Sequence, residues 1–131
     1  MRIRTMAWSL GFAGCTLAGP SGPVRVPLDQ DFTLRVGDSV EVAGAGFIVS
    51  FVSVPADSRC PATVQCVWQG DGAVAVLVGR SGGDTSLTLH TTLDPKLASV
   101  APYTLKLIDL APGSAPSDVR EYAATLRVAT Q

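Results

Sequence analysis

The feature that most constrains the fold is a short-range alternation of apolar and polar residues, interrupted every few residues by Gly, Pro or Asp. The C-terminal run shows it well, because Tyr122, Ala124, Leu126 and Val128 are separated by single small or polar residues. A period of two places every second side chain on the same face of an extended strand. No segment keeps the 3.6-residue period of a helix. The pattern predicts an all-β fold, a small antiparallel β-sandwich or barrel of about seven or eight strands.

Several runs have the alternation, or the β-branched composition, of strands. They cover residues 24–28, 32–36, 40–42, 47–54, 73–79, 86–92, 103–107 and 122–128. The Gly37-Asp38 pair and the segment Ser81–Asp84 predict the turns of two hairpins. We expect Pro55 to end the run before it, because proline cannot donate to a β-ladder. Asp118–Glu121, after a polar segment rich in proline, has room for one helical turn.

Composition narrows the class of protein. Only 16% of the 131 residues are charged, the formal net charge is −1, and 13 glycines and 9 prolines punctuate the chain. Average globular proteins carry roughly 25% charged residues, and a nucleic-acid-binding surface needs many cationic side chains. Nucleic acid is therefore not an expected partner, and the length fits one domain.

The N-terminus has the features of an export signal. Arg2 and Arg4 precede a mostly apolar stretch, residues 5–13, that ends in small residues before Cys15. The stretch is too short to cross a bilayer, which takes about 20 apolar residues, so it predicts a signal peptide at residues 1–14. Phe12–Cys15 resembles a bacterial lipobox, which implies cleavage before Cys15 and acylation of that residue. Residues 15–23 then make a lipidated cysteine with a flexible tether, and residues 24–131 make the domain.

The lipobox resemblance implies a location as well. The chain would be exported to the cell envelope, with the membrane as its partner through the N-terminal lipid. By resemblance to the lipoproteins of Gram-negative bacteria, Thr16 after the cysteine would allow sorting to the outer membrane. An ordinary secretory signal beside an unmodified Cys15, or a misassigned start codon, are the alternatives.

Cys60 and Cys66 remain once Cys15 is set aside. An exported protein meets an oxidising compartment, so we expect these two residues to form a disulfide. A zinc site would need more ligands than the single histidine, His90, adds to them. A thioredoxin-like redox site would need a CxxC motif, which the sequence lacks. No metal and no cofactor are expected.

The cysteines belong to the segment DSRCPATVQCVWQG, residues 57–70. This segment resembles the motif of a group of uncharacterised bacterial secreted proteins and lipoproteins, in which DSRCP is followed by four residues, a second cysteine, Val-Trp and Gly. The later LTLHTT, YTLKLIDLAP and YAATLRV segments are similar to the same family, so the resemblance covers most of the mature chain. It implies no particular activity.

Two interpretations of this segment stay open. In one, the disulfide presents a rigid binding surface for a protein or an envelope ligand. The candidate binding residues are Asp57, Ser58, Arg59, Trp68 and Gln69. In the other, Trp68 covers the disulfide and one end of the core, while Asp57 and Arg59 form a local ion pair and the domain is purely structural.

Catalysis is not expected, and no catalytic residue is assigned. His90 falls on the strand face opposite Leu87 and Leu89, which predicts a solvent-facing side chain, and no GxSxG nucleophile motif is present. A small hydrolase and a secreted protease inhibitor of the chagasin type are less favoured alternatives. The sequence thus favours an envelope-anchored, non-catalytic lipoprotein domain.

Overall fold

The computed structural model describes Gly11, Gly14 and residues 24–61 and 63–131, and it is all-β, as predicted. The described residues form nine strands and one 3₁₀-helix. Their bounds are β1 Val24–Val26, β2 Asp31–Arg35, β3 Ser39–Val42, β4 Phe47–Asp57, β5 Gly72–Arg80, β6 Gly83–His90, β7 Leu97–Val100, β8 Tyr103–Ala111, η1 Val119–Glu121 and β9 Ala123–Thr130. The predicted lipidation site, Cys15, and the tether up to residue 23 lie outside the described residues, as does nearly all of the predicted signal peptide.

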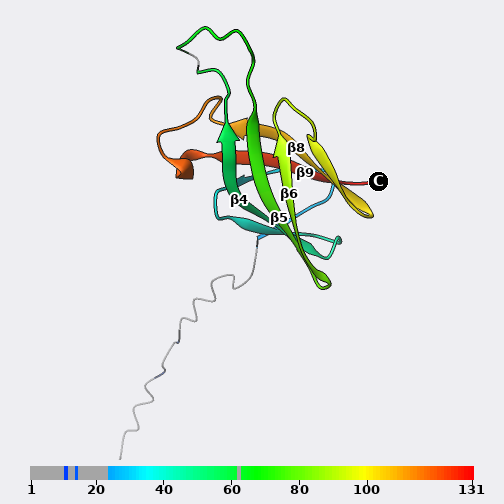
Figure 1. Ribbon diagram of the computed structural model, residues 1–131. Helices are drawn as coiled ribbons and strands as arrows, with labels where there is room; N and C mark the ends of the chain where they lie inside the picture. Colours follow the sequence, from blue (N-terminus) through cyan, green and yellow to red (C-terminus); the bar gives the residue numbers. More distant parts are fainter. Residues whose placement is uncertain (1–10, 12–13, 15–23, 62) are drawn as a thin grey trace, which may run out of the picture.

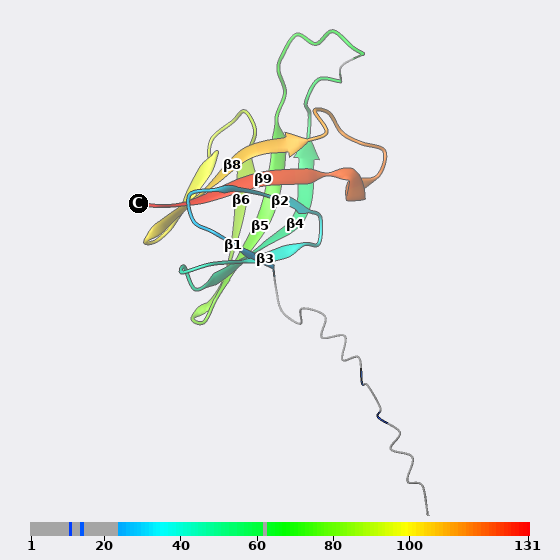
Figure 2. The same ribbon diagram turned by 180° about the vertical axis from the view of Figure 1, so that it is seen from behind.

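The strands form two sheets, which face each other as the two layers of a β-sandwich (Figure 1). The five-stranded sheet has the order β1-β3-β4-β5-β6 and the four-stranded sheet has the order β2-β9-β8-β7. Every pairing is antiparallel except that of β1 with β3. The view from behind shows the four-stranded sheet in front of β4, β5 and β6 (Figure 2). The two-sheet arrangement selects the sandwich from the two architectures that the sequence allowed.

The core consists of the inward halves of the alternating runs. The largest fully buried side chains are Phe47, Phe51, Leu89, Leu105, Leu110 and Leu126, with Val42, Val49, Val74, Val76, Val78 and Val128. Tyr122 and Ala124 are buried beside Leu126 and Val128, as their alternation predicted. Because strand side chains alternate between faces, each inward residue is followed by one that points away from the core.

The first predicted hairpin is wrong. β2 pairs with β9 in one sheet, whereas β3 pairs with β4 and β1 in the other. The turn between them therefore crosses from sheet to sheet instead of folding back. The crossing is fixed by Gly37, whose N–H donates to the Phe51 carbonyl over 2.8 Å, and by Phe51, whose N–H donates to the Asp38 carbonyl over 3.0 Å. The second predicted hairpin, β5 with β6, is confirmed.

Pro55 does not end its strand, contrary to the prediction. β4 continues to Asp57, and its register with β5 shifts between Ser53 and Ala56, so Pro55 falls within a β-irregularity. A bulge leaves one residue out of the ladder, and a proline there costs no ladder hydrogen bond. The short strand β7 lies between the runs 86–92 and 103–107, outside every run predicted to be a strand.

One loop extends far beyond the sheets, between the end of β4 and the start of β5, at the top of Figure 1. Val24 of β1 pairs with Val40 of β3, which in turn pairs with Val49 of β4, so these three residues lie side by side across the sheet. The loop begins after Asp57, eight residues beyond Val49 along β4. At about 3.3 Å per residue, the base of the loop lies roughly 25 Å along the strand from the start of β1.

No helix in the described part of the chain is long and apolar enough to span a membrane.

Candidate binding surface

The protruding segment, residues 58–71, is here called the disulfide loop, and its base is held closed by Ser58 and Asp71. The Ser58 N–H donates to the Asp71 carbonyl over 2.8 Å. The Asp71 N–H donates to the Ser58 hydroxyl over 3.0 Å, and that hydroxyl lies 3.1 Å from the Asp71 carbonyl. Ser58 therefore links the two sides of the loop by hydrogen bonds, so this exposed residue has a structural role.

Gly70 allows the chain to close at this point. Its φ is +72°, in the left-handed region, and a Cβ atom there would overlap the Ser58 carbonyl oxygen and lie 2.8 Å from Arg59 Cα. Only glycine combines this backbone conformation with so close an approach of another backbone segment.

Cys60 and Cys66 form the predicted disulfide, with their Cα atoms 5.9 Å apart. The bridge separates the described tip residues, 61 and 63–65, from two arms that return to the sheet. A structural disulfide is consistent with an oxidising, extracellular type of compartment. The short ring restricts the loop conformation before any ligand arrives.

Asp57 and Arg59 form a buried ion pair under the loop. Arg59 donates from Nε to Asp57 Oδ1 over 2.8 Å and from an Nη atom to Oδ2 over 2.7 Å, and its other Nη atom donates to the Leu110 carbonyl over 2.6 Å. The Tyr122 hydroxyl donates to Asp57 Oδ2 over 2.8 Å. The side chains of Asp57 and Arg59 are only 4% and 10% exposed. The expectation that the loop displays these two residues is therefore wrong, and the alternative of a local ion pair is confirmed.

The electrostatics follow from these bonds. The hydrogen bond from the Arg59 guanidinium lowers the pKa of Asp57 below its ordinary value of 3.8, and this effect outweighs burial, which acts the other way. Burial, with the hydrogen bond to Asp57, raises the pKa of Tyr122. The carboxylate thus stays ionised and the phenol stays protonated, and these bonds hold the loop base on Leu110 of β8 and on Tyr122, just before β9.

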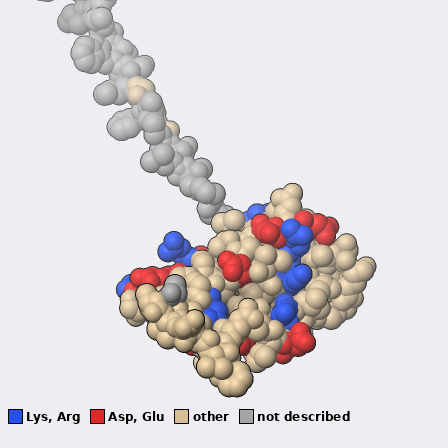
Figure 3. All heavy atoms as spheres, turned by 90° about the horizontal axis from the view of Figure 1, so that it is seen from above, with Lys and Arg blue, Asp and Glu red and all other residues tan. Residues whose placement is uncertain are grey.

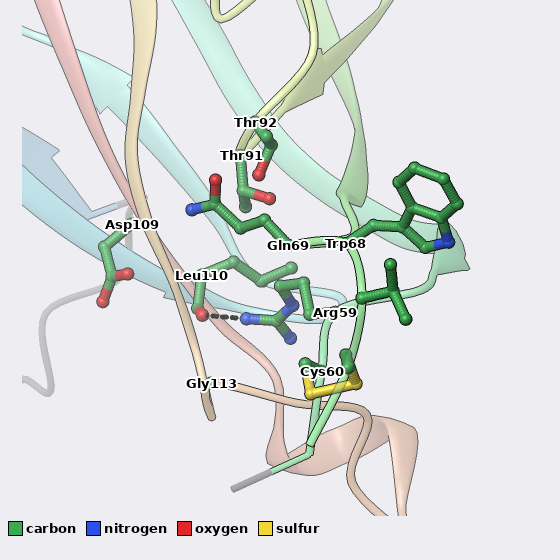
Figure 4. Close-up of a pocket in the computed structure, with 11 residues that line it drawn as sticks. Arg59, Cys60, Trp68, Gln69, Thr91, Thr92, Asp109, Leu110 and Gly113 are labelled. Carbon is green, nitrogen blue, oxygen red and sulfur yellow. Dashed lines mark hydrogen bonds between the residues drawn. A yellow bond between two sulfur atoms is a disulfide. The ribbon is translucent and has the colours of Figure 1, made fainter. Parts of the chain in front are cut away.

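Trp68 has the opposite environment. Its side chain is 82% exposed and that of the preceding Val67 is 88% exposed. In Figure 4 the indole of Trp68 and the amide of Gln69 point to opposite sides of the loop, as successive residues of an extended chain do. The interpretation that Trp68 covers the core is therefore wrong, because the core ends at Leu110 and Tyr122 instead.

Two hollows lie on either side of the chain at Trp68 and Gln69. The larger, of about 560 Å³, is lined by the disulfide, Arg59, Gln69, Asp109 and Leu110 among others (Figure 4). The second, of about 480 Å³, lies between Trp68 and Leu93, with Cys66 and Asp71 on its wall. Leu93 is itself 58% exposed. We call Val67, Trp68, Gln69 and Leu93, with these two hollows, the Trp68 surface.

The loop residues of the Trp68 surface carry no charge, and its charged groups, Arg59, Asp71 and Asp109, are on the walls of the two hollows. Residues 60–69 include no Asp, Glu, Lys or Arg. Figure 3 looks onto this end of the molecule and shows uncharged side chains over most of the protruding loop, with charged ones mainly beside it. The loop itself offers apolar and aromatic contacts and the amide of Gln69 to a ligand.

Sequence reasoning missed one polar pair near the loop. His90 Nδ1 lies 2.6 Å from Asp71 Oδ2, and Asp71 Oδ1 accepts the backbone N–H groups of Thr92 and Leu93 over 2.9 and 3.1 Å. Burial raises the pKa of Asp71, but these hydrogen bonds outweigh it and lower the pKa overall. His90 is on the outward face, as predicted, but it is half-buried by Asp71 instead of open to solvent. No sequence signal connects the two residues, because Asp71 lies in a segment that resembles a simple turn.

Among the described residues, His90 and Asp71 form the pair that most resembles part of a catalytic site. In the part of the chain that the structure describes, no side-chain hydroxyl is hydrogen-bonded to the His90 ring, and no group of three or more His, Cys, Asp or Glu residues is placed to hold a metal ion. The Asp71 carboxylate instead holds the His90 ring and the backbone of the segment that follows β6.

Comparisons with known proteins give no family. No family model, no curated protein and no solved structure matches the chain.

Proposed function

We propose that this chain is an envelope-anchored, non-catalytic lipoprotein whose domain, residues 24–131, binds a protein or another envelope ligand through the Trp68 surface. The anchor is an acylated Cys15, which follows a cleaved signal at residues 1–14. Several acyl chains on one residue hold a protein at a bilayer stably, whereas one chain holds it only marginally.

The observation that carries the proposal is an almost fully exposed tryptophan on a loop whose base is fixed. Burial of an indole ring releases a large apolar area from water, so an exposed one is a free-energy cost that binding recovers. Tryptophan is enriched among the residues that dominate binding energy. The disulfide, the Ser58–Asp71 bonds and the Asp57–Arg59 pair hold the loop in one conformation, which lowers the entropy cost of association.

The buried ion pair supports a purely structural role for Asp57 and Arg59. Substitution of either would disturb the loop base and would confuse lost folding with lost binding. The binding test therefore changes Trp68, which is exposed.

The test compares three full-length chains in affinity capture from envelope extract: wild type, Trp68→Ala and Val52→Ala. Val52 is a matched control because its side chain is 51% exposed on β4, away from the loop. We expect at least a tenfold loss of captured ligand for Trp68→Ala, which corresponds to about 1.4 kcal/mol, and no loss for Val52→Ala. Equal capture by wild type and Trp68→Ala would contradict the proposal.

A second readout uses fluorescence. The two tryptophans are Trp8 and Trp68, and cleavage of residues 1–14 removes Trp8, so the mature chain has Trp68 as its only tryptophan. We expect the emission of a water-exposed indole from the free protein, and a blue shift when the captured ligand is added. Intact-mass measurement of membrane-extracted protein tests the anchor, and an unmodified Cys15 would exclude lipidation.

A further inference from the structure

β6 forms one edge of the five-stranded sheet, because it pairs with β5 on one side and with no strand of the described residues on the other. The His90 N–H points away from β5, since it donates to the Pro95 carbonyl over 2.9 Å. In an antiparallel strand the N–H and C=O of one residue point the same way and the direction alternates along the strand. The backbone groups of Asp84, Ser86 and Thr88 therefore point outward too. In the described residues these groups have no hydrogen-bond partner.

The other three edges carry features that discourage pairing with another chain. β1 has three residues and β7 has four, while β2 has five and exposes Asp31 and Arg35. Short length and charged side chains are the usual protection of a sheet edge, as are proline and bulges. β6 has eight residues in regular register with β5, and from Thr85 to Leu89 it contains neither a charge nor a proline.

We propose that β6 pairs with β6 of a second copy of this chain, antiparallel about a two-fold axis at Ser86. In this register Ser86 lies opposite Ser86 of the second copy, and Asp84 lies opposite Thr88 in both directions. The three residues with open backbone groups in each strand, Asp84, Ser86 and Thr88, then all form hydrogen-bonded pairs. Each such pair exchanges two N–H···O=C bonds, so about six hydrogen bonds form across the axis.

The neighbouring registers are poorer. A shift toward His90 would place it opposite Asp84, but the His90 N–H is already bonded to Pro95. A shift in the other direction would place Thr88 opposite Gly82, which belongs to the β5–β6 turn. The Ser86 register is the one that uses every open group.

The side chains suit a two-fold contact. Asp84 is the only carboxylate of β6, and the two copies of it would be four residues apart along the strands, roughly 13 Å, which exceeds a Debye length of about 8 Å at physiological salt. On the inner face Leu87 is half-buried at the open edge and packs against the core. In the dimer each Leu87 lies opposite Thr85 of the second copy, which covers the exposed part of its side chain.

Cysteine cross-linking tests the register, in a Cys15→Ser background that leaves only the bridged pair. The Cα atoms of a hydrogen-bonded cross-strand pair are about 5.5 Å apart, within the range that a disulfide spans. We expect mild oxidation to link two Ser86→Cys chains covalently and to leave Thr88→Cys chains unlinked, because the two Thr88 positions lie on opposite sides of the axis. Equal linking of both variants, or of neither, would overturn the proposal.

Analytical ultracentrifugation of the full-length protein tests the interface without new cysteines. We expect wild type to show a concentration-dependent monomer–dimer equilibrium. Ser86→Lys places two ammonium groups face to face, so we expect its dissociation constant to rise at least about tenfold. Leu97→Lys, at the half-exposed edge strand β7, is the matched control and keeps the wild-type constant. A wild-type protein that remains monomeric at every concentration, or a Ser86→Lys dimer of wild-type strength, would exclude pairing through β6.

Discussion

Two Asp-x-Arg segments in this chain, at Asp57–Arg59 and Asp118–Arg120, form ion pairs of nearly the same geometry in different surroundings. The shortest N···O distances are 2.7 and 2.8 Å. The first pair is buried, whereas the side chains of Asp118 and Arg120 are 39% and 85% exposed. Leu110 and Tyr122, from distant parts of the chain, make the difference because they supply the remaining bonds to the first pair.

The comparison gives a prediction at the scale of single residues. Asp57→Ala leaves the buried Arg59 guanidinium without its counter-ion, which costs about 3 kcal/mol of the free energy of unfolding. Asp118→Ala removes an exposed pair and the cap of the single turn η1, so it should cost much less stability than Asp57→Ala. Urea unfolding followed by far-UV circular dichroism measures both variants. Equal losses for the two variants would mean that burial does not determine how much the Asp57–Arg59 pair stabilises the fold.

The same pairs show what a local sequence could not reveal. DSR and DVR look alike, and the placement of one over the core depends on Leu110 and Tyr122, which lie more than fifty residues away in sequence. The exposure of Trp68 was unpredictable for the same reason. A tryptophan after a disulfide is normally expected to cover apolar surface, but here Leu110 and Tyr122 already close this end of the core.

At the scale of elements, the disulfide loop depends on Gly70. In Gly70→Ala the methyl group would collide with the Ser58 backbone and the residue would sit at φ near +72°. We expect a loss of about 2 kcal/mol or more in the free energy of unfolding, together with faster proteolysis inside residues 58–71.

Gly113→Ala is the matched control, since its added Cβ meets nothing within 4 Å and it lies outside the left-handed region. We expect wild-type stability and proteolysis for this variant. Should Gly70→Ala behave in the same way, the loop base is not closed as described.

Strand existence was largely predictable, whereas strand partners were not. Alternation identified the inward faces of β3, β5 and β9, because period two is a local property. The hairpin between β5 and β6 also followed from its two-residue turn. The Gly37-Asp38 turn has similar residues but crosses between sheets, and that choice depends on Phe51, a residue in a different strand. Pro55 led to a wrong prediction of the strand end for a related reason, because the sequence of a single strand does not show where a bulge forms.

At the scale of the whole molecule, the Asp57 carboxylate contributes to how stability depends on pH. Asp57 has its pKa lowered below 3.8, chiefly by the Arg59 hydrogen bond. A lowered folded-state pKa stabilises the protein at all pH values above that of the unfolded chain. The contribution is lost as the pH falls from about 4 through the lowered value.

We therefore expect the urea midpoint to be level between about pH 5 and pH 7 and to fall steeply below about pH 4. Asp57→Asn should begin lower and fall less steeply, because one of the titrating groups has been removed. Parallel pH profiles for wild type and Asp57→Asn would show that this carboxylate has no special role in acid unfolding.

The distance between the start of β1 and the base of the disulfide loop has a consequence for topography in the envelope. With Cys15 acylated as proposed, the tether joins the domain at Val24, and the Trp68 surface lies roughly 25 Å further along β4. The Trp68 surface is then at the end of the domain that is far from the point where the tether attaches. A ligand would be met in trans, across the gap between envelope layers, instead of in cis within the plane of the anchoring membrane.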